Sequence, residues 1–200
     1  MNNNIKPQAF ILIGRSGCGK GTQGKLIQDY LKKIDSDREL LYIQTGAEFR
    51  NFIKETGYTQ SLSKKVYDNG DLQPEFLAAA MWLNVLIREF KGNEHIIFDG
   101  TPRKFHEAGT LDSIFDFYGF DRPYVLNIVI SREESVKRLL LRKRIDDIKE
   151  EIEKRLNWYE SDVVPAINFY KNNKRYNYLE IDGEKSVEDI NKDIISRLGL

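Results

Sequence analysis

The chain has 200 residues, 40% of them hydrophobic and 31% charged, a composition that suits one globular domain with room for a small insertion. Basic and acidic residues each number 31, so no net charge draws the chain to nucleic acid or to a membrane surface. The single cysteine, Cys18, excludes an internal disulfide and a cysteine-based zinc site. Because the N-terminus lacks a signal-peptide pattern and the apolar runs are too short to span a bilayer, we expect a cytoplasmic protein.

Five short apolar runs, each suited to a strand buried on both faces, alternate with stretches of helical periodicity. The runs are residues 9–13, 40–43, 96–98, 124–130 and 178–181. The helical stretches are residues 20–34, 75–90, 105–117, 133–141, 149–170 and 187–198. This alternation predicts an α/β fold, a doubly wound five-stranded parallel sheet with helices on both faces and ligands at the carboxyl ends of the strands.

The stretch between the second and third strands, residues 44–73, is too long for one simple crossover. It contains two short helical patterns that are broken at Gly57 and at Asn69-Gly70. We interpret it as a small helical insertion within one domain spanning residues 1–200.

A glycine-rich loop, GRSGCGKGT at residues 14–22, directly follows the first strand and opens a helix. It contains the G-x4-G-K core of a phosphate-binding loop, in which glycines let backbone N–H groups wrap a phosphate chain and Lys20 adds a mobile charge. Gly21 stands where serine or threonine usually holds magnesium, and Thr22 comes one place later. A turn without chemical function is disfavoured by the flanking strand and helix, and Cys18 is expected to be a packing residue rather than a redox switch.

Residues 14–23, which end in Lys-Gly-Thr-Gln, resemble the phosphate loop of nucleoside monophosphate kinases, and of adenylate kinases most of all. That family places glycine after the lysine, so Gly21 fits it. Further similar segments follow in the family's order: TGAEFR at 45–50, DNGDLQP at 68–74, DGTPR at 99–103, the arginines 138, 142 and 144 with the aspartates 146 and 147, EIEKRLNWY at 151–159, and IDGEKSV at 181–187.

The resemblance implies reversible transfer of the ATP γ-phosphoryl group to a nucleoside monophosphate, with Mg²⁺ accompanying ATP. Transfer between two polyanions requires positive charge, which arginine forks supply with fixed direction. One alternative is a P-loop nucleotide-binding protein without transferase activity, which would not require a second anion site. Another is a kinase for shikimate or a nucleoside, but those relatives lack the 45–50 segment.

Roles are carried over from the family position by position. The expected catalytic residues are Lys20, Arg103, Arg142, Arg144 and Arg155. The expected ATP-binding residues are Gly17, Cys18, Gly19, Lys20, Gly21, Thr22, Arg138, Arg142 and Lys185. The expected AMP-binding residues are Thr45, Arg50, Asp71, Leu72, Gln73, Gly100, Thr101, Pro102, Arg103, Glu107, Arg144 and Arg155. Asp99, at the end of a buried strand, is expected to orient magnesium through water.

The lid is the first departure from the family. Where the family inserts a loop or small domain, Lys143 alone separates Arg142 from Arg144, so residues 142–147 are interpreted as a vestigial lid. Asp147-x-x-Glu150 has the pattern of a capping box that would start a new helix. No Gly or Pro breaks the run at that point, however, so residues 133–170 are predicted to bend only slightly. We expect reduced closure and hypothesise that a neighbouring subunit of a homo-oligomer covers the site.

The acceptor base pocket is the second departure. Glu107 stands where adenylate kinases have glutamine, and Thr101 where the family usually has an aromatic residue. A carboxylate accepts hydrogen bonds but does not donate them unless protonated, so it matches the adenine amino group and fits guanine's two donors at least as well. Thr45 favours adenine by resemblance. We therefore expect AMP as the acceptor, with GMP or another monophosphate as the alternative.

Overall fold

The computed structural model describes residues 6–142, 144 and 147–200. Five parallel strands form one sheet in the order β2-β3-β1-β4-β5, which confirms the predicted sheet. The strands are β1 (Ala9–Ile13), β2 (Leu40–Gln44), β3 (His95–Asp99), β4 (Tyr124–Val129) and β5 (Asn177–Asp182). Each predicted strand is found, with its ends shifted by at most one residue.

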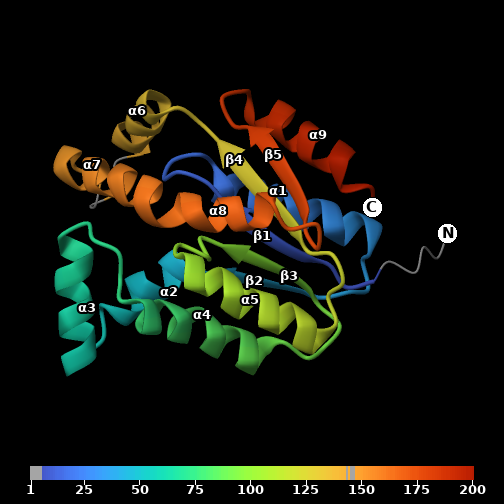
Figure 1. Ribbon diagram of the computed structural model, residues 1–200, viewed down its shortest axis with the longest axis horizontal. Coiled ribbons are helices and arrows are strands. Elements are labelled where there is room, and N and C mark those ends of the chain that lie inside the picture. Colours follow the sequence, from blue (N-terminus) through green and yellow to red (C-terminus); the bar gives the residue numbers. More distant parts are fainter. Residues whose placement is uncertain (1–5, 143, 145–146) are drawn as a thin grey trace.

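Helices cover both faces of this sheet (Figure 1). They are α1 (Lys20–Ile34), α2 (Thr45–Phe52), α3 (Tyr58–Asp68), α4 (Glu75–Glu89), α5 (Phe105–Tyr118), α6 (Arg132–Arg142), α7 (Lys149–Trp158), α8 (Val164–Lys171) and α9 (Val187–Leu198). A π-helical turn at Tyr159–Val163 joins α7 to α8 in one continuous rod. Helices α1 and α9 pack on one face, and α4, α5 and α8 on the other.

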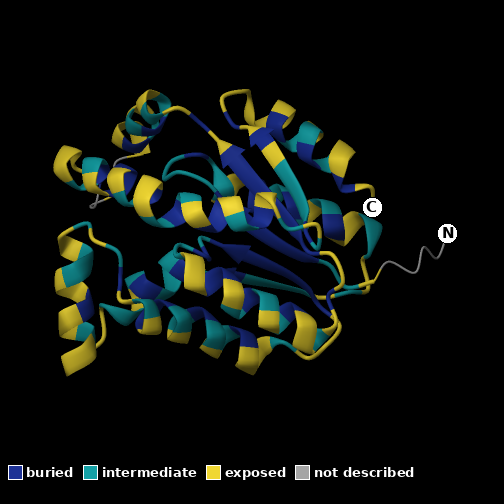
Figure 2. Cartoon of the chain, viewed as in Figure 1, coloured by how far each residue is buried: buried dark blue, intermediate teal, exposed yellow. Residues whose placement is uncertain are grey.

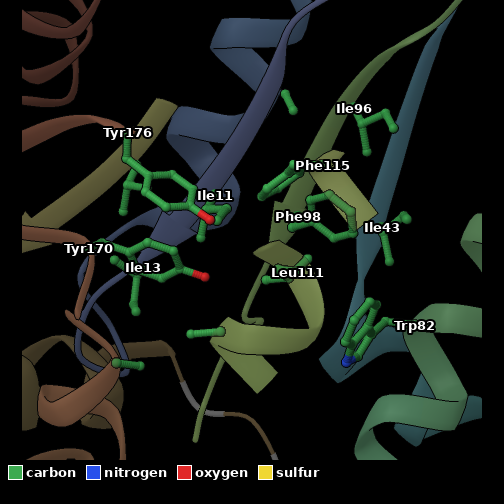
Figure 3. Close-up of a cluster of buried hydrophobic side chains, with 14 of the residues drawn as sticks. Ile11, Ile13, Ile43, Trp82, Ile96, Phe98, Leu111, Phe115, Tyr170 and Tyr176 are labelled. Atoms are coloured by element: carbon green, nitrogen blue, oxygen red, sulfur yellow. The ribbon is translucent and has the colours of Figure 1, made fainter. Parts of the chain in front are cut away.

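The two faces of the sheet form separate cores because successive side chains of a strand point in opposite directions. In β1, Ile11 and Ile13 join the core that contains Trp82 and Phe98, drawn in Figure 3. Phe10 and Leu12, which point to the opposite face, belong to the other core together with residues of α1 and α9. Figure 2 shows the central strands buried and the outer helix faces exposed. Burial on both sides fixes the strand ends, from which the loops of the site emerge.

The region of the expected lid differs from the prediction. Helix α6 ends at Arg142 and α7 begins at Lys149 as a separate helix, so the slight bend predicted over residues 133–170 is wrong. The capping box is also wrong, because Ile148 is the residue before α7 and no side chain caps that helix. The carboxylate of Asp147 instead accepts hydrogen bonds from two arginines, which outcompete the helix amides for it. Of the vestigial lid, Lys143, Ile145 and Asp146 lie outside the described residues.

The segment between β2 and α4 contains both expected short helices. Helix α2 packs on α4 through Phe49, Leu77 and Ala78. Ser63 is the one residue of α3 that is buried in the described structure, so α3 is held mainly by polar contacts. That residues 44–73 form one small helical insertion remains a prediction.

No helix in the described ranges combines the length and apolar character needed to cross a membrane.

Candidate functional site

A cavity of about 870 Å³ opens where β1, β2 and β3 end. This is the edge of the sheet at which the sequence predicts ligands. Six arginines and two lysines line it, against four carboxylates, among the residues that the structure describes. The arginines are Arg50, Arg103, Arg138, Arg142, Arg144 and Arg155. A chain without net charge thus gathers positive charge in one place, as an anion site requires.

The glycine-rich loop wraps one end of this cavity between β1 and α1. Gly17 and Gly19 have φ angles of 82° and 97°, which glycine adopts without strain. A Cβ on Gly14 would lie 2.4 Å from the carbonyl oxygen of Ile128, so a side chain there would displace β4. At the start of α1, Lys20 Nζ donates to the carbonyl oxygens of Gly14 at 2.7 Å and Arg15 at 3.0 Å.

The outer side of the loop is anchored to the rest of the fold. The Ser135 hydroxyl of α6 donates to the carbonyl of Ser16 at 2.6 Å. Arg15 donates to the Ile130 carbonyl at 2.7 Å and pairs with Glu160 of the π-helical turn. Cys18 is fully buried in the core beneath the loop, as expected of a packing residue. These contacts hold the phosphate cradle in place without a ligand.

Asp99 ends β3 and faces the start of α1. Its Oδ2 accepts hydrogen bonds from the Tyr42 hydroxyl and the Gln44 amide, both at 2.8 Å. Burial and the adjacent carboxylate raise the pKa of Tyr42, which remains a neutral donor. Asp99 lies 3.7 Å from a Cβ position on Gly21, so a carboxylate stands beside the phosphate loop.

Arg50 of α2 and Arg103 of the loop after β3 converge at Gly46. A Cβ placed there would lie 3.3 Å from one guanidinium and 3.6 Å from the other. Desolvation lowers the pKa of Arg103, Glu107 and Asp99 raise it, and Arg50 and Arg155 lower it further. Arginine nevertheless stays protonated near neutral pH, so these guanidinium groups form a second cluster of positive charge that an anion would stabilise.

Asp147 joins two further arginines of the cavity. Arg142 binds it in bidentate fashion at 2.8 and 2.7 Å, and Arg155 binds it at 3.0 Å. Burial alone would raise the pKa of Asp147, but the hydrogen bonds from Arg142, Arg155 and the Arg144 amide outweigh it and lower the pKa to about 2. A single buried carboxylate therefore fixes the directions of both guanidinium groups.

A second pocket, of about 10 Å³, adjoins the arginine pair and is lined by Thr45, Leu72 and Glu107 among others. The Glu107 carboxylate accepts from the Arg103 amide and from the Trp82 indole, each at 3.2 Å. Desolvation raises the pKa of Glu107 against these hydrogen bonds. The hydroxyls of Thr45 and Thr101 bond to each other beside it.

Most of the predicted site residues meet at these two cavities. Fifteen line the large cavity: Gly17, Gly19, Lys20, Gly21, Thr22, Arg50, Asp71, Gln73, Asp99, Gly100, Arg103, Arg138, Arg142, Arg144 and Arg155. Thr45, Leu72 and Glu107 line the small one. Cys18, Thr101 and Pro102 are buried and line neither. Lys185 lies after β5, 3.8 Å from Asp182, and also lines neither cavity in the described structure. The Gln73 amide, although at the cavity, is bonded to Ser63 of α3.

Sequence reasoning missed several residues of the site. Trp158 lines the cavity three residues after Arg155. This spacing places both side chains on one face of α7, and it can be read directly from the sequence. Trp82 and the bridging role of Asp147 had no such signal, because their partners are known only from the folded structure.

This fold and site define a P-loop nucleotide-binding α/β protein. The family model "Adenylate kinase" matches residues 12–175. The chain therefore belongs to the adenylate kinase family and is a phosphotransferase.

Bacterial relatives match the chain over almost its whole length. It is similar to adenylate kinase 1 of Nostoc sp., with 30% identity over 95% of this chain and 98% of the relative. It is also similar to the adenylate kinases of Parabacteroides distasonis, with 32% identity over 90% and 92% of the two chains, and of Bacteroides thetaiotaomicron, with 32% identity over 92% and 95%.

The Asp147 bridge predicts how stability depends on pH. A carboxyl whose pKa falls from 3.8 to about 2 on folding stabilises the fold above pH 3.8, and this contribution is lost as pH falls through 2. Asp147→Asn should lower the unfolding free energy at pH 7 by about 2 kcal/mol, and the difference should shrink below pH 3. Urea unfolding at several pH values measures this.

The matched control is Asp68→Asn, which removes an exposed carboxylate paired with Lys64. It should change stability by less than about 0.5 kcal/mol. A difference between wild type and Asp147→Asn that stays constant from pH 7 to pH 2 would contradict the bridge.

Proposed function

We propose that the protein is a nucleoside monophosphate kinase that reversibly transfers the γ-phosphoryl group of ATP to AMP, giving two ADP. One observation carries the proposal: the phosphate loop and the Arg50–Arg103 pair line the same cavity. A protein that binds a single nucleotide needs only the first of these anion sites. Two anion sites in one cavity suit two phosphorylated substrates that react with each other.

The donor side consists of the phosphate loop and α6. Backbone N–H groups at the start of α1 hold the ATP phosphates, and Lys20 exchanges its bonds with Gly14 and Arg15 for phosphate oxygens. Arg138, which lines the cavity and pairs with Glu134 at 2.7 Å, packs on the adenine. The backbone near Lys185 completes the adenine site.

The acceptor side consists of the residues around Gly46. Arg50 and Arg103 hold the acceptor phosphate, whose oxygen attacks the γ-phosphorus directly, so no covalent intermediate with the protein is required. Arg142, Arg144 and Arg155 stabilise the charge on the transferred group. Catalysis is then alignment and charge stabilisation, and Asp147 contributes by fixing two of these arginines.

Magnesium bound with ATP would neutralise phosphate charge, and the donor set fits it. Mg²⁺ takes oxygen ligands and usually keeps several waters beside one or two carboxylates and the substrate phosphates. Asp99 lines the cavity next to the loop, and the two side-chain hydrogen bonds that it accepts from described residues both end on Oδ2. Oδ1 of Asp99 would hold a metal-bound water, and Thr22 lines the same cavity.

Residues 44–73 act as the acceptor-binding insertion, and residues 142–147 as the vestigial lid, in a homo-oligomer whose neighbouring subunit covers the site. The reason for proposing an oligomer is the short lid: one residue separates Arg142 from Arg144. Static light scattering of the active enzyme is expected to give a mass above 23.4 kDa; a fully active monomer would rule out the covering subunit.

Two substitutions test the reaction. Lys20→Met removes the mobile cation, and Arg103→Ala removes half of the acceptor pair, so each should lower kcat/KM in the ATP–AMP reaction at least about 100-fold. Arg122→Ala, which removes an exposed arginine remote from the cavity lining, is the matched control and should retain activity. Near wild-type turnover in both site variants, with circular dichroism showing intact folds, would refute the assignment.

The acceptor base is tested by measuring kcat/KM for AMP, GMP, CMP and UMP at fixed ATP. We expect AMP to be preferred, because the pocket presents Thr45 and a carboxylate that accepts from an exocyclic amine. GMP is the second candidate, because the Glu107 carboxylate that lines the pocket accepts hydrogen bonds and guanine offers two donors. A higher kcat/KM for GMP than for AMP would make GMP the substrate.

A further inference from the structure

Helix α7 lies against the turn that ends α3, and three of its residues make the contact (Figure 1). Lys154 Nζ donates to the Asn69 carbonyl at 2.7 Å, and the Trp158 indole donates to the Gly70 carbonyl at 3.3 Å. A Cβ on Gly70 would lie 3.0 Å from the Glu151 Cβ, so the backbones approach closely. The three positions on α7 follow at intervals of three and four, which places them on one face of the helix.

Trp158 also contacts the acceptor side of the cavity with its ring. The Arg103 guanidinium carbon lies 5.7 Å from the centre of the Trp158 ring, within the range of a cation–π interaction. Trp158 is half-buried and lines the same cavity. One side chain therefore binds the turn at Gly70 through its N–H and the acceptor arginine through its face.

Both partners of Trp158 need this support. Desolvation lowers the pKa of Arg103, Glu107 and Asp99 raise it, and Arg50 and Arg155 lower it again. The two arginines therefore repel Arg103 while the carboxylates attract it. Helix α3 buries only Ser63 in the described structure, so apolar packing contributes little to its position. An aromatic face next to Arg103 opposes the repulsion, and the contacts of α7 hold the end of α3.

We propose that Trp158 is a positioning residue: it holds Arg103 directed at the acceptor phosphate and, with Lys154, fastens the Asn69–Gly70 turn over the acceptor site. This inference rests on the proposed function because it takes Arg103 to bind the acceptor phosphate. It predicts that changes in this contact weaken the acceptor and spare the donor, since ATP binds at the phosphate loop and α6.

The experiment measures the Kd values of AMP, of GMP in parallel, and of ATP by isothermal titration calorimetry. Trp158→Leu removes the aromatic face and the N–H, and should weaken binding of the monophosphate at least about fivefold while ATP stays within about twofold. Trp158→Phe keeps a ring face and loses the N–H, so its loss should be smaller. Lys154→Met should also weaken the monophosphate selectively, whereas Lys149→Met, an exposed lysine of the same helix, should change neither Kd.

Fluorescence gives a signature that a merely structural role would not produce. The chain has two tryptophans, Trp82 and Trp158, so the difference between wild type and Trp158→Phe isolates the emission of Trp158. Neutralisation of the Arg103 charge by a bound phosphate should change that emission when monophosphate is added, and ATP alone should change it much less.

Equal weakening of monophosphate and ATP, or weakening of neither, would overturn the proposal. If Trp158→Leu fails to fold, Lys154→Met and Trp158→Phe decide, and unchanged monophosphate binding in both counts against it. Because calorimetry needs no turnover, wild type that binds a monophosphate without transferring phosphate would refute the proposed reaction alone. Wild type that binds neither AMP nor GMP would refute this inference as well.

Discussion

Repulsion among like charges is the constraint on which the site depends. Six arginines face one cavity, and the fold must hold them there before any phosphate arrives. The restraints are ion pairs with carboxylates and a hydrogen bond to a backbone carbonyl. Arg138 is paired with Glu134 one helical turn away, Arg142 and Arg155 share a buried aspartate, and Arg103 donates to the Gly100 carbonyl at 3.1 Å. Preorganised cations of this kind cost little reorganisation when charge develops in a transition state.

The sheet makes this arrangement possible by fixing the origins of the loops. The three strands that end at the cavity are consecutive in the sheet, β2, β3 and β1, and two cores press on them from opposite sides. The phosphate loop, α2 and the loop carrying Arg103 thus start from a rigid edge. Loops on a rigid scaffold can carry chemistry without losing precision.

The sequence predicted the elements and most of the site because both have local signals. Continuous apolar runs marked all five strands, and the glycine loop with Lys20 marked one end of the large cavity. What escaped were contacts between residues distant in the chain. Trp158 and Gly70 are 88 positions apart, and Trp82 and Glu107 are 25 apart, so no periodicity joins them. The local pattern around Asp147 gave a wrong prediction. It predicted a capping box, but the carboxylate binds two arginines instead, since a charge-assisted bidentate bond is stronger than a helix cap.

The π-helical turn at Tyr159–Val163 determines how α8 is rotated about the helix axis relative to α7. Before the turn, Arg155 and Trp158 face the cavity; after it, Ala166, Ile167 and Tyr170 face the sheet. A π turn widens the helix by one residue, which rotates everything beyond it relative to an uninterrupted α-helix. Loss of a single residue there would turn the arginine away from the cavity or the apolar face away from the core. The spacing between these two faces is therefore expected to tolerate substitutions far better than insertions or deletions.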